Sequence, residues 1–128
     1  MFDSGDGQDR LLRADLEACR LYTGAVYTLA TAPGDLRDRI HDAYVGQAIH
    51  ANQLVRLLPP HVSERIQLLA GRLGTHPDTG HPDATELVWQ TLLTMDHDGL
   101  QDVARGIYFI THDLVVATEQ TRGGRAEA

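Results

Sequence analysis

Prolines and glycines divide this chain into segments, and within each segment apolar residues recur every three or four positions. The clearest breaks are Pro33-Gly34, Pro59-Pro60 and Gly74. Proline lacks a backbone donor and clashes with the preceding helical turn, and glycine weakens a helix, so each break ends one helix before the next begins. Apolar residues at this spacing share one face of a helix. The sequence therefore predicts an all-α fold.

Five helical segments follow from these breaks, over about 9–31, 35–58, 60–73, 83–95 and 99–120. The first two are long and joined by a short turn, which is typical of an antiparallel hairpin. We expect an antiparallel helical bundle of four main helices plus one short helix. Residues 9–120 then form a single helical-bundle domain, with 1–8 as a flexible N-terminus and 121–128 as a flexible C-terminal tail.

The periodicity also predicts which residues face the core. In the first segment the inward stripe is Leu12, Leu16, Cys19, Thr23, Val26 and Ala30, widened by Leu21, Ala25 and Leu29. In the second segment the stripe includes Gln47 and His50. Asp35 and Asp98 suit the N-caps of the second and last segments, because a short carboxylate can accept the free backbone N–H groups there.

Residues 107–116, IYFITHDLVV, are apolar on nearly every side. Their β-branched and aromatic side chains favour a strand, but the flanking residues favour a helix and no other segment offers a partner strand. We therefore expect the most buried helix of the bundle here.

Composition and charge narrow the class of protein. The 128 residues suit one domain. With 18 acidic and 11 basic residues the net charge is −7, which argues against nucleic-acid binding and against a basic helix on a membrane surface. All of the basic residues are arginine, which indicates a high-GC genome, such as that of a high-GC bacterium. No signal-like segment and no apolar run of about 20 residues is present, so we expect a cytoplasmic protein.

The tripeptide His-Pro-Asp occurs twice in THPDTGHPDAT, residues 75–85. An HPD loop between two helices resembles J-domain co-chaperones, but the preceding segment has only Arg65 and Arg72 where that family is strongly basic. We interpret His76 to His81 as an exposed turn, because proline and glycine favour one. Asp83, with Glu86 three residues later, then suits a reciprocal cap for the fourth helix.

The stretch Gln47-Ala48-Ile49-His50 differs by one residue from a Glu-x-x-His motif. In ferritin-like di-iron bundles two helices carry that motif and two others each supply a lone Glu. The second segment resembles a degenerate copy of such a helix. This resemblance implies a divalent metal or iron held inside the bundle by Glu17, His50, Glu86 and His112.

Two positions depart from the ferritin-like pattern. Gln47 and Phe109 stand where the motif carboxylates would be, and hard cations prefer charged oxygen ligands. The alternative is that His50 and His112 are core histidines with hydrogen-bond partners, because an unpaired buried polar group costs roughly 1–3 kcal/mol. The candidate partners are Gln47, Tyr22, Tyr44 and Tyr108.

Arg105 and His112, separated by six residues, carry a further resemblance. Ribonucleases of the HEPN class, which are helical bundles, use an Arg and a His at similar spacing. This resemblance implies RNA cleavage as an alternative function. That family has a polar residue after the Arg, whereas Gly106 follows it here.

No complete set of catalytic residues is evident, and the lone Cys19 lies on a predicted inward stripe, where a thiol is inert. We therefore expect a small, soluble, acidic, non-enzymatic interaction or regulatory module without a cofactor. Its partner is another protein or itself, as a homodimer, because the apolar surface of 107–116 must be covered by other helices or by a second subunit.

Overall fold

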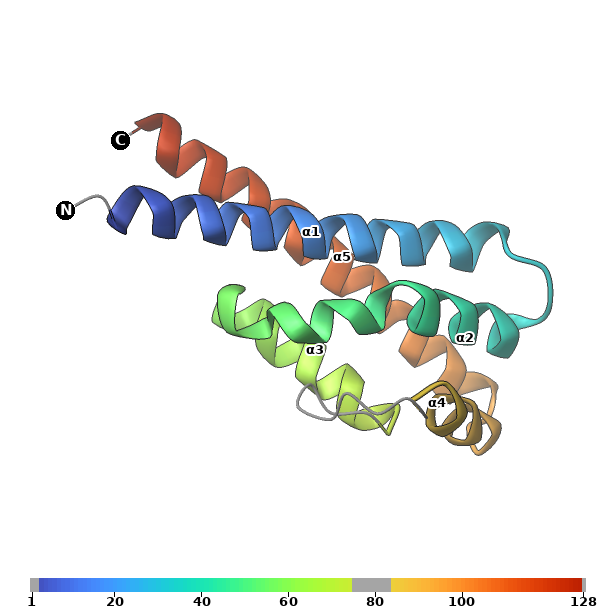
Figure 1. The fold of residues 1–128 in the computed structure, drawn as a ribbon. Coiled ribbons are helices and arrows are strands. Elements are labelled where there is room, and N and C mark those ends of the chain that lie inside the picture. The colour runs from blue at the N-terminus through green and yellow to red at the C-terminus, as the bar shows by residue number, and fades with distance from the viewer. Residues whose placement is uncertain (1–2, 75–83, 128) are drawn as a thin grey trace.

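The structure, a computed structural model, describes the backbone of residues 3–74 and 84–127 and the side chains of residues 9–74 and 85–120. All regular elements in this part of the chain are helices (Figure 1). They are α1 (Asp3–Thr31), α2 (Leu36–Gly46), the 3-10 helix η1 (Ala48–Leu57), α3 (Pro60–Arg72), α4 (Ala84–Leu93) and α5 (His97–Glu127). The prediction of an all-α fold is confirmed.

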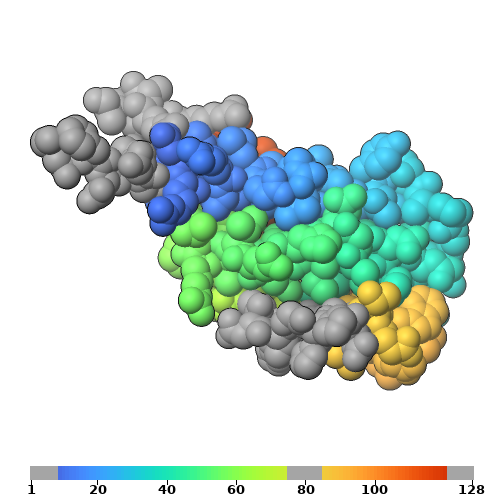
Figure 2. Space-filling view, in the orientation of Figure 1, coloured from blue at the N-terminus to red at the C-terminus, as the bar shows by residue number. Residues whose placement is uncertain are grey.

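The other helices pack around a hairpin that α1 forms with the α2–η1 segment. In Figure 1, α1 and the α2–η1 segment lie antiparallel and side by side, and α5 crosses behind them. α5 contacts α1, α2 and α3, whereas α4 packs on α2 and α3 packs on η1. Figure 2 shows that α1 and the α2–η1 segment together form one continuous face of the molecule, with α4 below it.

The turn between α1 and α2 depends on Gly34 and Asp35. Gly34 has a φ of 102°, a left-handed conformation that glycine adopts without strain. The Asp35 carboxylate accepts the Asp38 N–H at 3.0 Å, and the Asp38 carboxylate accepts the Asp35 N–H at 3.3 Å. This reciprocal cap confirms Asp35 as the N-cap, and the hydrogen bond from the Asp38 N–H holds the pKa of the Asp35 carboxyl below its usual value.

The N-cap predicted for the last helix is wrong by two residues. α5 begins at His97, and Asp96 caps it by accepting the Gly99 N–H at 2.8 Å. Asp98 instead lies in the first turn, where its negative charge is stabilised by the helix dipole.

The two terminal helices are longer than predicted. α1 begins at Asp3 and α5 ends at Glu127. Both helices therefore reach into the segments expected to be tails, although the flexibility of 1–8 and 121–128 stays a prediction. The HPD turn, with His76, His81 and Asp83, lies outside the described residues.

The single helix predicted over 35–58 is wrong, because the chain leaves the α-helix at Gln47 and continues as η1. Gln47 has a φ of −134° and a ψ of −69°. Gly46 precedes it and has low helix propensity. The Gln47 side chain lies against Gly24 of α1, where a Cβ would stand 3.0 Å from Gln47 Oε1. A 3-10 helix has three residues per turn, so the residues beyond Gln47 depart from the α-helical period.

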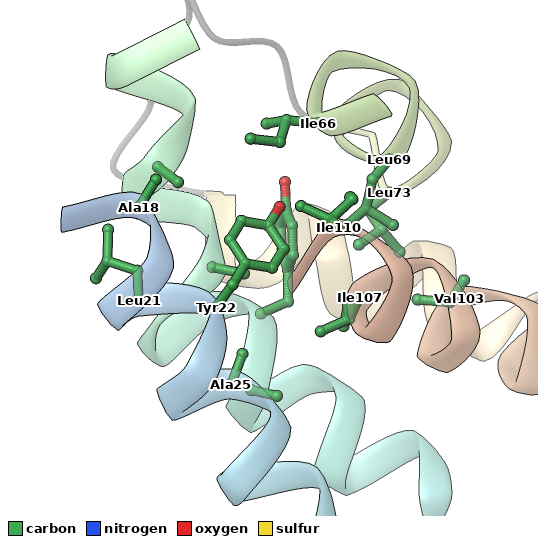
Figure 3. Packing of buried hydrophobic residues seen from close by; sticks show 14 of the residues in the cluster. Ala18, Leu21, Tyr22, Ala25, Ile66, Leu69, Leu73, Val103, Ile107 and Ile110 are labelled. Atoms are coloured by element: carbon green, nitrogen blue, oxygen red, sulfur yellow. The ribbon is translucent and has the colours of Figure 1, made fainter. Parts of the chain in front are cut away.

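The core is centred on two tyrosines, Tyr22 of α1 and Tyr44 of α2, which are both fully buried. The Asn52 amide of η1 donates to the Tyr44 hydroxyl at 3.4 Å. Figure 3 shows the Tyr22 ring among residues of α1, α3 and α5, which are Ala18, Leu21, Ala25, Ile66, Ile107 and Ile110.

The inward stripe predicted for α1 is wrong in part. The buried residues are Ala14, Asp15, Ala18, Leu21, Tyr22 and Ala25, whereas Leu16, Thr23 and Ala30 are exposed. Small side chains let α1 approach its neighbours closely, and the large Tyr22 ring fills the space between them. Leu21 and Ala25 are buried as predicted, whereas the centre of the predicted stripe, at Leu16 and Thr23, is exposed.

Candidate interaction surface

α5 carries exposed apolar side chains on the side opposite its core stripe. The exposed fractions are 59% for Tyr108, 51% for Phe109, 44% for Val115 and 39% for Val116. The buried stripe consists of Leu100, Val103, Ile107, Ile110, Leu114 and Ala117. Residues 107–116, predicted to form the most buried helix of the bundle, are therefore buried on one side and exposed on the opposite side among the described residues.

These exposed residues form one continuous helix face. Steps of three and four residues return to the same side of an α-helix, and the exposed residues of α5 follow such steps. We call this surface the α5 outer face, and its members are Arg105, Tyr108, Phe109, His112, Val115, Val116 and Glu119. The Tyr108 and Phe109 rings contact each other edge to face, with centroids 5.9 Å apart. The surface is apolar with a charged residue near each end.

A groove of about 220 Å³ runs beside the α5 outer face, between α3 and α5. Its lining is mostly apolar, and it consists of Arg65, Leu68, Leu69, Arg72, Asp102, Val103, Gly106, Phe109 and Ile110. Two ion pairs join its walls, Arg65–Asp113 at 2.9 Å and Arg72–Asp102 at 3.9 Å. Phe109 belongs both to the groove and to the α5 outer face, so the two surfaces are continuous.

The four residues predicted as metal ligands do not come together. No group of three or more His, Cys, Asp and Glu side chains that could hold a metal exists within residues 9–74 and 85–120. Glu17 forms a two-point ion pair with Arg20, at 2.6 and 3.1 Å, and the hydrogen bond from Arg20 lowers its pKa. Glu86 is exposed and accepts a hydrogen bond from Gln90 at 3.1 Å.

His50 and His112 are both exposed, so the alternative of two core histidines is wrong. His50 follows the break at Gln47, and the tighter η1 helix buries Ala48, Ala51 and Asn52 instead. His112 lies on α5 diametrically away from Ile110 and Leu114, in the middle of the outer face. Helical spacing predicts His50 on the inward stripe of the second segment, and the apolar neighbours of His112 predict a buried position for it, but neither signal shows how the helix is rotated.

Arg105 and His112, the residues of the ribonuclease resemblance, share the α5 outer face and lie two helical turns apart. Arg105 contacts Asp102 at 3.4 Å within its own helix. Neither residue lines the groove. The two side chains stand on open surface, without a described concave site around them that would exclude water from a reaction.

Two residues that sequence reasoning missed attach α4 to α2. Arg37 donates to the carbonyls of Leu92 and Met95, both at 3.0 Å, and so satisfies the C-terminal end of α4. His41 Nε2 lies 3.1 Å from the Thr85 carbonyl, and its ring packs edge to face on Trp89. Both lie in the first turns of α2. From the sequence alone they are polar residues on a helix surface, and nothing in it indicates that they contact α4.

A second hollow, of about 450 Å³, lies where α2 and α5 begin. Its lining is Asp35, Leu36, Arg37, Arg39, His97 and Leu100. The two arginines already serve the fold, because Arg37 binds the end of α4 and Arg39 donates to the Leu29 carbonyl at 3.0 Å. This hollow therefore offers fewer free polar groups than its lining suggests.

None of the described helices combines the length and the apolar character needed to cross a lipid bilayer. Comparison with protein-family models, with curated proteins and with solved structures found no match to this chain.

Proposed function

We propose that this protein is a non-enzymatic interaction module that self-associates through the α5 outer face. The observation that supports this proposal is the exposure of Tyr108, Phe109, Val115 and Val116 on one side of a single helix. Exposed aromatic residues clustered in one patch are characteristic of protein interfaces, where they supply much of the binding energy. Burying them against a second copy removes apolar surface from water at about 25 cal/mol per Å².

The composition of this surface also favours a protein partner over other ligands. An extended helix face offers no enclosed volume for a small molecule, whereas it suits packing against another helix. The acidic net charge of −7 disfavours a nucleic acid as the partner. The α5 outer face is not needed to bury the core of one copy, so association through it can be reversible, as a regulatory role requires.

Self-association is tested by light scattering coupled to size exclusion over a range of concentrations up to about 100 μM, since small interfaces lie at the weak end of known affinities. We expect the mass to rise from one copy towards two. Replacing Tyr108→Ser and Phe109→Ser together should keep the protein monomeric at every concentration.

Two control variants show which surface matters. Tyr27→Ser removes a tyrosine of α1 that is even more exposed than Tyr108, and Leu68→Ser alters the groove but not the outer face. Both should associate like the wild type. A wild type that stays monomeric over the whole range would contradict the proposal, as would Tyr27→Ser weakening association as much as the Tyr108 and Phe109 changes.

A further inference from the structure

The α5 outer face has the same character when read in either direction from His112. Phe109 and Val115 stand three residues from it on the two sides, and Tyr108 and Val116 stand four residues away. Arg105 and Glu119 stand seven residues away, with opposite charges. Each apolar residue thus has an apolar counterpart on the other side of His112, and the positive residue has a negative counterpart.

We propose that two copies pair through antiparallel α5 helices about a two-fold axis that passes beside His112. This inference rests on the proposed self-association and adds its register. In this arrangement Tyr108 meets Val116 of the second copy and Phe109 meets its Val115, so the interface is isologous. Arg105 of each copy meets Glu119 of the other, which forms two ion pairs at the two ends of the interface.

Charge selects this arrangement over the parallel one. A parallel pair in register would set Arg105 beside Arg105 and Glu119 beside Glu119, which places like charges together. In the antiparallel pair both ends carry opposite charges. Exposed ion pairs are individually weak, so the apolar residues supply the affinity and the charges choose the direction and register.

The size of the surface sets the expected strength. Residues 105–119 span about 21 Å of helix at a rise of about 1.5 Å per residue. An interface of this length is at the small end of specific protein contacts, so we expect dissociation constants on the order of micromolar. Each copy keeps its own core, so the monomer stays folded when the pair dissociates.

Reversal of the two charges tests the register. Arg105→Glu alone and Glu119→Arg alone should each weaken dimerisation about tenfold, because each places like charges at both ends. The two changes combined should restore the affinity to within about threefold of the wild type. Arg13→Glu, the same change of charge at an exposed position of α1, is the matched control and should have little effect. All variants should unfold at about the wild-type temperature.

Cross-linking gives a second, geometric readout. In a Cys19→Ser background, His112→Cys should form an intersubunit disulfide under mild oxidation, because both copies of this position lie at the axis. Val116→Cys is the matched control, because cysteine is close to valine in size and the two copies of this position lie eight residues, or about 12 Å, apart along the helices and cannot be bridged. Faster cross-linking at position 116 would overturn the register.

The outcomes separate this inference from the proposed function. If the wild type dimerises through Tyr108 and Phe109 but the combined charge reversal is as weak as the sum of its parts, the register is wrong and self-association stands. If the wild type is monomeric at all concentrations, both proposals fail.

Discussion

Tyr22 and Tyr44 lie together in the core but differ in their hydrogen bonds. The Tyr44 hydroxyl accepts a bond from Asn52, whereas the Tyr22 hydroxyl has no hydrogen-bond partner among the described residues. Burial raises the pKa of Tyr22 well above its usual value, and the proximity of Tyr44 adds to the rise. The Tyr22 hydroxyl therefore stays protonated at neutral pH, and its burial without a described partner lowers the stability of the fold.

Replacing Tyr22→Phe should raise the free energy of unfolding by about 1 kcal/mol, because it removes a buried polar group that lacks a partner. Tyr44→Phe should lower it by about 1–3 kcal/mol, because the buried Asn52 amide loses its acceptor. Urea denaturation of the two variants measures both effects. If Tyr22→Phe is the more destabilising of the two, a hydrogen bond to the Tyr22 hydroxyl exists.

The Asp35 cap predicts a pH dependence. Its carboxyl has a folded-state pKa below the unfolded value of 3.8, so its contribution to stability is present above about pH 4 and is lost as the pH falls through the lower, folded-state pKa. Asp35→Ala should melt below the wild type at neutral pH, and the gap should narrow as the pH falls below the unfolded-state value of 3.8. Thermal melts at several pH values decide this, and a gap that is unchanged by acid would show that the charged cap is not its cause.

At the scale of the helices, two glycines that look alike in sequence differ in what surrounds them. Gly106 of α5 lines the groove, and a Cβ there would meet only Leu69 Cδ1, at 4.0 Å. Gly24 of α1 faces Gln47, and a Cβ there would stand 3.0 Å from its amide oxygen. One site has room for a methyl group and the other does not.

Gly106→Ala should stabilise the protein by about 0.5–1 kcal/mol, since alanine is the better helix former and nothing needs to move. Gly24→Ala gains the same propensity but must displace Gln47, so it should be neutral or destabilising. Chemical denaturation compares the pair directly. Equal gains at both positions would mean that Gln47 is free to move away from α1.

The helices themselves could be predicted from the sequence, because proline, glycine and apolar spacing are local signals. The break at Gln47 could not, because the space that holds its side chain is created by Gly24 on another helix. The buried side of α1 was also misplaced, since alanine and leucine compete for it and only close packing of neighbouring helices favours alanine. Tertiary packing decided each of these differences.

At the scale of the whole molecule, a site built from several helices depends on how each is rotated about its own axis. The predicted metal ligands Glu17, His50, Glu86 and His112 come from four elements, so four rotations must be correct, and in the structure none of the four side chains is buried in the core. The α5 outer face lies on one helix and needs no other element. The apolar breadth of IYFITHDLVV marked it in the sequence, although it was assigned to the core.

The 3-10 geometry of η1 has a consequence for how the molecule opens. A run of ten residues is long for this helix type, and the hydrogen bond at its C-terminal end is long, at 3.4 Å from the Leu58 nitrogen to the Val55 oxygen. We expect native-state hydrogen exchange to show lower protection for the amides of 48–57 than for those of 14–25 in α1. The protein would then unfold locally at η1 while α1 and α5 keep their structure. Equal protection of the η1 and α1 amides would mean instead that the domain unfolds only as one unit.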